Sequence, residues 1–228
     1  MTIAANLHAI QAEITAACRR ANRDPRQVRL VAVSKTKPAA LIDEAHAAGQ
    51  PLFGESYVQE FIDKVDAVRG AADWHFIGHL QSNKVKYLRG RVGMIHSVDR
   101  LSLAEEINRQ WARLGRAVDV LVQVNLGDED SKSGVAPDDA VDLVRALAAL
   151  PHLRVRGLMC LPPFFDDAEQ VRPFFRRLRE LAAAIAAQRI PGVSMDELSM
   201  GMSHDFVVAI EEGATLVRIG TAIFGERA

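Results

Sequence analysis

Lys35 stands just after an apolar run, where its amine has the surroundings of a nucleophile. The run covers residues 28–34. Because side chains alternate along a strand, Val31, Val33 and Lys35 share one face. A poorly solvated amine in that position has a lowered pKa, and its neutral form can attack an aldehyde. The alternative is that Lys35 extends along apolar surface and places its charge in solvent at the rim.

Glycine and hydroxyl residues follow two apolar runs near the C-terminal end of the chain. These candidate anion-binding residues are Ser199, Gly201, Gly220 and Thr221. Glycines allow a close backbone approach, hydroxyls donate hydrogen bonds, and N–H groups at a helix start face anions. The pattern predicts a phosphate site, with ordinary turn chemistry as the alternative reading.

Three other segments have part of a known site motif and lack an essential residue. The segment 128–134 has its glycine at the seventh position of a calcium loop, whereas the motif needs it at the sixth. The segment 220–225 has P-loop glycine spacing without the following Lys-Ser/Thr pair. His75 and His79 are four residues apart without the glutamate of a zinc-protease motif. We therefore expect neither a metal site nor nucleotide hydrolysis.

Eight short apolar runs recur along the chain and predict strands. They cover residues 28–34, 51–53, 74–77, 94–97, 118–125, 153–159, 198–200 and 215–219. Several are rich in Val, Leu and Ile, which is typical of strands buried on both faces. Helical spacing of apolar residues lies between or before the runs, most clearly over 3–21, 101–114, 138–150 and 171–185.

This alternation predicts an α/β fold with a parallel sheet. Eight units in one chain of this length favour a single (β/α)8 TIM barrel, preceded by an extra N-terminal helix and forming one domain over 1–228. An open doubly wound sheet is the alternative. In a barrel, functional residues lie at the C-terminal ends of the strands. Lys35 and the glycine–hydroxyl residues would then share one face.

Composition agrees with an ordinary globular domain. The 228 residues include 28 Lys+Arg and 29 Asp+Glu, which gives a net charge of −1. This balance offers no electrostatic reason to expect nucleic acid or an anionic membrane surface as a partner. No secretory signal or membrane-spanning run is recognisable, so we expect a cytoplasmic location. Cys18 and Cys160 are expected to be free thiols.

A nucleophilic lysine and a phosphate site at one end of a barrel indicate a ligand that carries both an aldehyde and a phosphate. Pyridoxal 5′-phosphate (PLP) is the obvious candidate for this cofactor.

The chain resembles the pyridoxal-phosphate homeostasis protein family, whose fold is that of the alanine racemase N-terminal barrel. Seven collinear stretches carry the resemblance and span nearly the whole chain. They are VAVSKTKP (31–38), FGESYVQE (53–60), WHFIGHLQSNK (74–84), QVN (123–125), SKSG (131–134), LSMGMS (198–203) and VRIGTAIFG (217–225).

The resemblance implies roles for individual residues. It implies that Lys35 forms the aldimine with PLP, and that Arg218 lies near the pyridine nitrogen, where a like charge opposes its protonation. The implied phosphate ligands are Ser199, Gly201, Gly220 and Thr221. Two positions depart from the family pattern. Ser56 replaces a usual asparagine, which puts any ring contact there in doubt, and His204, where acidic residues are common, has no assigned role.

The resemblance also implies a function without efficient catalysis. The resemblance implies a PLP-binding protein that maintains the intracellular supply of the cofactor and passes it to apo-enzymes. Alanine racemases add an all-β domain with a catalytic tyrosine, and this chain has only Tyr57 and Tyr87. The alternative is a PLP-dependent amino-acid racemase or lyase. A barrel that docks onto other proteins is compatible with the first reading, and we expect a monomer.

Overall fold

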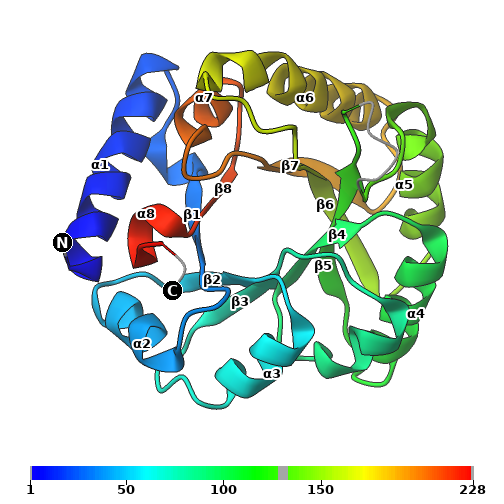
Figure 1. Ribbon diagram of the computed structural model, residues 1–228. Helices are drawn as coiled ribbons and strands as arrows, with labels where there is room; N and C mark the ends of the chain where they lie inside the picture. The colour runs from blue at the N-terminus through cyan, green and yellow to red at the C-terminus, as the bar shows by residue number, and fades with distance from the viewer. Residues whose placement is uncertain (1, 128–132, 227–228) are drawn as a thin grey trace.

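Eight parallel strands close into a barrel in the computed structural model, which describes residues 2–127 and 133–226 (Figure 1). The strands are β1 (Arg29–Val33), β2 (Leu52–Glu55), β3 (Asp73–Phe76), β4 (Met94–Val98), β5 (Val118–Val124), β6 (Leu153–Cys160), β7 (Val193–Ser199) and β8 (Leu216–Ile219). Each strand pairs with the next, and β8 returns to β1, where Leu30 lies opposite Val217. The prediction of a TIM barrel is confirmed, and the open-sheet alternative is wrong.

Helices surround this barrel. They are α1 (Ile3–Arg20), α2 (Ala39–Ala47), α3 (Val58–Val65), α4 (Leu101–Ala112), α5 (Ala140–Ala148), α6 (Arg172–Ala187), α7 (Phe206–Glu211) and α8 (Thr221–Phe224). The extra N-terminal helix is α1, and Asn6 Nδ2 ties it to α8 by donating to the Ile223 carbonyl at 2.9 Å. A 3₁₀ helix, Ser82–Tyr87, follows β3 in place of an α-helix. None of the helices in the described part of the chain combines the length and apolar character that crossing a membrane requires.

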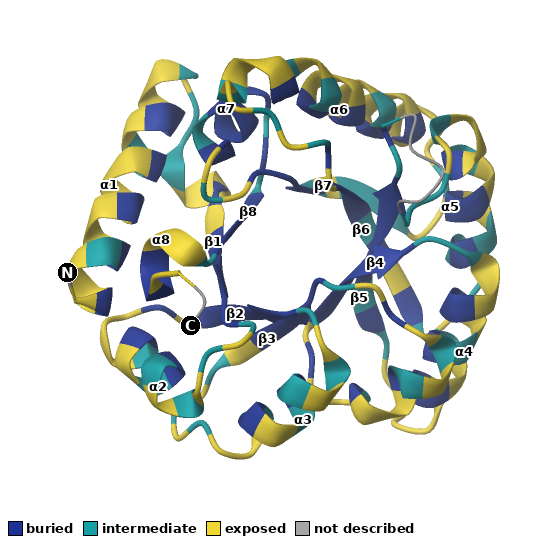
Figure 2. Cartoon of the chain, viewed as in Figure 1, coloured by how far each residue is buried: buried dark blue, intermediate teal, exposed yellow. Residues whose placement is uncertain are grey.

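The apolar core has two parts. A small cluster fills the inside of the barrel with one side chain from each of six strands: Val31, Leu52, Met94, Leu121, Met159 and Leu216. A larger cluster lies between the strands and the helices, which turn a buried stripe inward and an exposed face outward (Figure 2). Because this layer fills the barrel interior, a ligand site in such a fold lies at the C-terminal ends of the strands, beyond the packed layer.

Two strands extend beyond their predicted limits by more than one residue. β2 continues through Gly54 to Glu55, whose side chain is fully buried. β7 begins at Val193, five residues before the apolar run at 198–200. Its first five residues are only partly buried or exposed, and the apolar Val193 and Met195 alternate there with polar residues, so no continuous apolar run marks the start of the strand. Both differences arise because burial of a strand residue depends on its neighbours in the fold.

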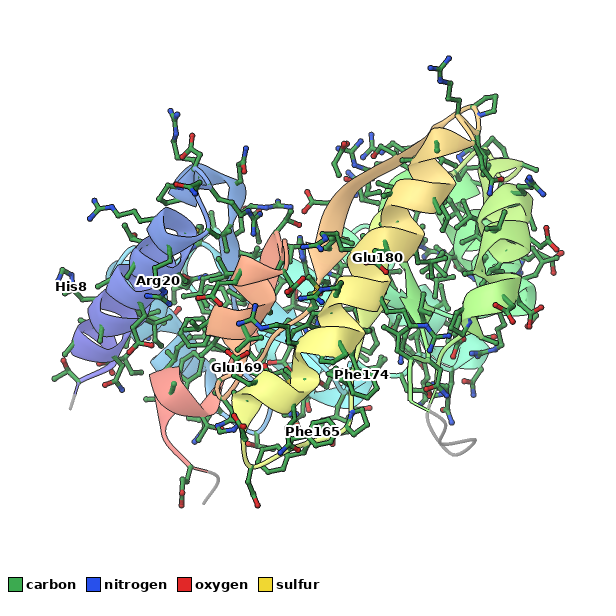
Figure 3. All side chains as sticks on the ribbon, turned by 90° about the horizontal axis from the view of Figure 1, so that it is seen from above. His8, Arg20, Phe165, Glu169, Phe174 and Glu180 are labelled. Carbon is green, nitrogen blue, oxygen red and sulfur yellow. The ribbon has the colours of Figure 1, made fainter. Side chains whose placement is uncertain are left out.

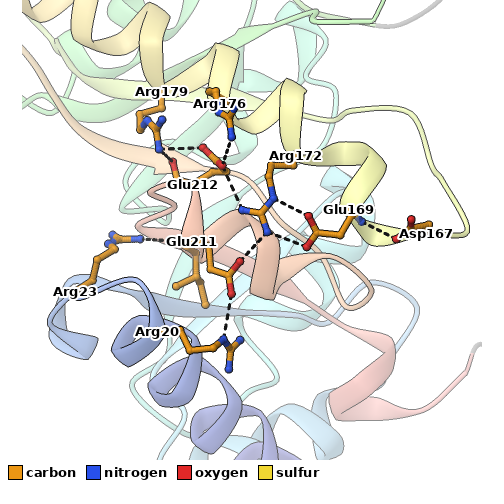
Figure 4. Close-up of polar contacts among 10 residues, drawn as sticks. Arg20, Arg23, Asp167, Glu169, Arg172, Arg176, Arg179, Glu211 and Glu212 are labelled. Carbon is orange, nitrogen blue, oxygen red and sulfur yellow. Dashed lines mark hydrogen bonds and ion pairs between the residues drawn. The ribbon is translucent and has the colours of Figure 1, made fainter.

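The helix α7 lies between α1 and α6 (Figure 3), and ion pairs connect its C-terminal end to both of these helices. Glu212, just after α7, has a side chain that is only 6% exposed. Its Oε1 accepts from Arg172 at 3.2 Å and from Arg176 at 3.1 Å, and Arg179 lies 2.9 Å from its Oε2 (Figure 4). Arg172 also reaches Glu211 at 2.7 Å. Nearby, the rings of Phe165 and Phe174 pack against each other at 5.8 Å (Figure 3).

We expect Glu212→Gln to destabilise the fold by about 1–3 kcal/mol near pH 7, because a buried carboxylate that binds cations is lost. Burial raises the pKa of Glu212, but the hydrogen bonds from Arg176 and Arg172 and the charge of Arg179 outweigh it, and the pKa is lower than usual. A depressed pKa adds stability above the unfolded-state pKa that is lost as pH falls through the folded-state pKa. Urea unfolding should therefore show a difference between the two proteins that shrinks under acid. A difference that grows toward low pH would contradict this assignment.

Candidate functional site

A cavity of about 340 Å³ opens at the C-terminal ends of the barrel strands. Its walls include residues at or just beyond the ends of β1, β2, β3, β6, β7 and β8. Of the predicted site residues, the cavity is lined by Lys35, Arg218, Gly220 and Thr221. Sequence positions almost 200 residues apart thus meet in one place. The cavity therefore lies on the face of the barrel where the site is expected.

Lys35 lies in a tight turn that follows β1. The Lys37 N–H donates to the Ser34 carbonyl at 3.0 Å and closes the turn. Within it, Thr36 has φ of 64°, in the left-handed region that residues other than glycine seldom adopt. Val33 and Lys35 both line the cavity, as the strand alternation predicts. Lys37 lines it too, but its Nζ donates to the Glu226 carbonyl at 2.6 Å.

Arg218 presents a buried cation to the cavity. The residue is 4% exposed. Its Nη1 donates to Ser199 Oγ at 2.6 Å, and its Nη2 donates to the Cys160 carbonyl at 2.9 Å. Burial lowers the pKa of Arg218, while the nearby charge of Asp205 favours its cationic form. Two hydrogen bonds therefore fix the orientation of the guanidinium group.

Ser199 is not among the residues that line the cavity. The side chain is fully buried, and besides accepting from Arg218 its Oγ lies 2.9 Å from His96 Nδ1. His96 Nε2 lies in turn 2.9 Å from His75 Nδ1. Burial lowers the pKa of His75 to about 3 and that of His96 well below its usual value, so both rings are neutral near pH 7. In this structure Ser199 therefore connects Arg218 to a chain of neutral histidines.

Gly201 shapes the turn after β7 without lining the cavity. Its φ is +92°, and a Cβ atom there would lie 2.6 Å from Ala209 Cβ. Its carbonyl accepts from the Arg218 N–H at 2.9 Å. The residues that follow it, Met202 and Ser203, do line the cavity. A glycine is needed here so that the turn can pack against α7 and still return to the cavity.

Ser203, Gly220 and Thr221 form the hydroxyl-rich part of the cavity wall. A Cβ atom at Gly220 would lie 3.0 Å from the Val33 carbonyl oxygen, so the backbone approaches β1 closely. Thr221 is the first residue of α8. Sequence reasoning did not single out Ser203, because no local pattern distinguishes it from Ser199, the predicted phosphate ligand in the same stretch 198–203.

One side of the cavity is lined by apolar residues that the sequence patterns do not single out. Phe164 is 73% exposed, and its ring centroid lies 5.4 Å from that of His204. Leu161 and Met202 complete this side. No sequence pattern marks 161–164 as functional, because a proline-containing loop after a strand is common. Ser56, the departure from the family pattern, also lines the cavity.

Of the segment 128–134 that was weighed as a calcium loop, residues 128–132 lie outside the described residues. The part that follows contacts the barrel. The Ser133 carbonyl accepts from Gln123 Nε2 at 2.8 Å, and Ser133 Oγ lies 3.0 Å from His79 Nδ1. Within 2–127 and 133–226, no group of three or more His, Cys, Asp or Glu side chains is arranged to hold a metal ion. Cys18 and Cys160 are both free and buried.

Fold and site together define a barrel of the class described as the N-terminal domain of alanine racemase, whose family model matches residues 5–228. The chain is 47% identical, over all 228 residues, to the pyridoxal phosphate homeostasis protein of Aquifex aeolicus, and it covers 99% of that relative. It is 45% identical to the protein of the same name from Escherichia coli strain K12, with 99% of this chain and 97% of the relative covered. The chain therefore belongs to the pyridoxal phosphate homeostasis protein family, as the seven stretches indicated.

Solved structures agree with this assignment. PipY of Synechococcus elongatus, determined with PLP bound, is 38% identical and superposes with a TM-score of 0.87 over 98% of this chain and 100% of that one. An alanine racemase from Corynebacterium glutamicum gives a TM-score of 0.73 at 17% identity, with 96% of this chain and 62% of the racemase covered. At that identity the racemase shows only a shared fold.

Proposed function

We propose that this chain binds PLP in the cavity and keeps the cofactor available to the cell without turning over a substrate efficiently. One observation carries the proposal. An amine, a buried guanidinium group and a hydroxyl-rich glycine segment, which lie far apart in the sequence, line the same cavity. The relatives named for PLP homeostasis and the PLP-bound PipY structure support it.

The cavity fits such a group in size and in chemistry. Small-molecule sites commonly measure about 300–1,000 Å³, and this one lies within that range. Lys35 supplies a primary amine, which condenses with an aldehyde and releases water. Ser203, Gly220 and Thr221 supply hydroxyl and backbone donors for a phosphate. Leu161 and Phe164 supply apolar surface for a ring.

When bound, PLP supplies an aldehyde carbon and an aromatic ring that can withdraw electrons. Lys35 would hold the aldehyde end, and Arg218 would face the ring. A guanidinium that stays charged disfavours a second positive charge beside it, so a ring nitrogen held there would remain unprotonated. This restrains carbanion chemistry and suits a protein that carries the cofactor.

A PLP-dependent racemase or lyase is the alternative function. A two-base racemase needs an acid or base on each face of its substrate. Among the described residues that line the cavity there is no tyrosine, and Tyr57 is 55% exposed outside it. The purified protein should show a visible absorption band after PLP is added, with no α-proton exchange of amino acids above background. Exchange at enzyme-like rates would support the alternative.

For the phosphate, we place Ser203 in contact with it and expect the predicted ligand Ser199 to act through Arg218. Ser203→Ala combined with Thr221→Val should weaken PLP binding by roughly a hundredfold or more, since two hydrogen bonds to a charged group are lost and each costs about 1.5–3 kcal/mol. Binding of pyridoxal, which lacks the phosphate, should change little. Fluorescence titration with both compounds checks this. An equal loss for both would contradict phosphate contact.

We further propose apo PLP-dependent enzymes as the recipients of the cofactor, and a monomeric state in solution. Homeostasis requires that bound PLP leave the cavity, and the open mouth beside Phe164 offers a route. Mixing the PLP-loaded protein with an apo-aminotransferase tests the first point through recovery of transaminase activity. Recovery no faster than that given by an equal amount of free PLP would argue against direct transfer.

A further inference from the structure

A buried ionic network lies directly behind the turn that carries Lys35. Lys64, on α3, is 8% exposed. Its Nζ donates to the Ser34 carbonyl at 2.7 Å, to Glu55 Oε1 at 2.7 Å and to Glu60 Oε2 at 3.0 Å. All three donor positions of the ammonium group are thereby used. Residues from β2 and α3 thus converge on the end of β1.

The network binds both neighbours of Lys35. On one side, Ser34 Oγ lies 2.7 Å from Glu55 Oε1, and the Ser34 carbonyl accepts from Lys64. On the other side, the Thr36 N–H donates to Glu60 Oε2 at 2.7 Å. Lys35 is therefore held between two residues whose positions are set by another part of the barrel.

Thr36 shows why the turn needs this support. Its left-handed backbone, with φ of 64°, is unfavourable for a β-branched residue. Such conformations persist when the surrounding structure over-determines them, and they cluster at functional sites. The hydrogen bond from the Thr36 N–H to Glu60 is one such constraint, and the closure of the turn by Lys37 is another.

Burying the charges of this network costs desolvation free energy that apolar side chains in the same place would avoid. Glu55 is fully buried, and its Oε2 has no hydrogen-bond partner. Burial raises the pKa of Glu55 in spite of the hydrogen bonds from Lys64 and Ser34. Buried ion pairs of this kind are often no more stabilising than apolar side chains of similar volume. A role in positioning the turn that carries Lys35 explains why a buried ion pair is present there.

We propose that Glu60 and Lys64 are positioning residues that hold the turn 34–37 in the conformation that directs Lys35 into the cavity. This inference rests on the proposed function, because it assigns Lys35 as the residue that captures PLP. Glu60 and Lys64 lie four residues apart on α3, so one face of that helix supplies both contacts. Neither residue lines the cavity.

Glu60→Ala is the decisive variant. Glu60 is only partly buried, so the variant should fold, while the Thr36 N–H loses its acceptor. We expect PLP attachment to Lys35, followed by borohydride trapping and peptide mass spectrometry, to slow by about tenfold or more, since small misplacements of a reacting group have effects of this size. Glu60→Gln keeps an acceptor oxygen and should restore most of the rate. Asp63→Ala, an exposed acid on the same helix, is the matched control.

Lys64→Met provides a second test, with thermal unfolding measured in parallel. A purely structural role would lower the unfolding temperature of these variants while the folded protein trapped PLP at the wild-type rate, and that result overturns the proposal. Failure of Glu60→Gln to recover more rate than Glu60→Ala overturns it as well. If the wild-type protein does not trap PLP on Lys35, that result contradicts the proposed function itself, whereas equal trapping rates in the wild-type protein and the variants contradict only the positioning role. If Lys64→Met does not fold, the two Glu60 variants still decide the question.

Discussion

Replacing Lys35 with alanine is expected to abolish covalent attachment of PLP. Lys35 lines the cavity at the end of β1, and alanine has no amine to condense with the aldehyde. Borohydride treatment of the wild-type protein with PLP should leave a stable adduct on the peptide that contains Lys35. The variant should show no such adduct and should lose the visible absorption band, while weaker noncovalent binding through the phosphate remains.

Lys37→Ala separates the two lysines of the turn. Lys37 also lines the cavity, but its Nζ is hydrogen-bonded to the Glu226 carbonyl, so it should not be the attachment site. We expect this variant to trap PLP on Lys35. An adduct found on Lys37 in the wild-type protein, or an unchanged spectrum for Lys35→Ala, would show that the amine has been assigned to the wrong residue.

Gly201→Ala should have the largest effect on stability of the substitutions considered, about 2–6 kcal/mol. A side chain at φ of +92° adds strain of about 1–3 kcal/mol, and the new Cβ would meet Ala209 Cβ at 2.6 Å, which adds an overpacking cost of similar size. The turn it supports also carries Ser203 to the cavity. Weaker PLP binding should therefore accompany the loss of stability.

Gly115→Ala is the matched control for that prediction. Gly115 also has a positive φ, of +62°, but nothing lies within 4 Å of the added Cβ. It should cost only about 1 kcal/mol, from backbone strain alone. Urea unfolding of both variants measures the difference. Equal effects would show that the contact with α7 contributes nothing and that strain explains the whole loss.

Local sequence patterns were sufficient to predict much of this protein. Alternation along 28–34 placed Lys35 on the same face as Val33, and the structure puts both on the cavity. The eight apolar runs predicted the barrel, because buried parallel strands need continuous apolar segments. Gly220 and Thr221 line the cavity because they follow such a strand directly, and their contact with a phosphate stays a prediction.

Only the tertiary structure decided which polar groups face the cavity and which support it. Ser199 and Ser203 belong to one short stretch, yet Ser199 lies under Arg218 while Ser203 lines the cavity. Glu60 and Lys64 reach the Lys35 turn from another unit of the barrel. The apolar patterns of helices and strands depend on residues only a few positions apart in the sequence. The contacts of Ser199, Glu60 and Lys64 form only when distant strands have closed into a barrel, so local patterns do not predict them.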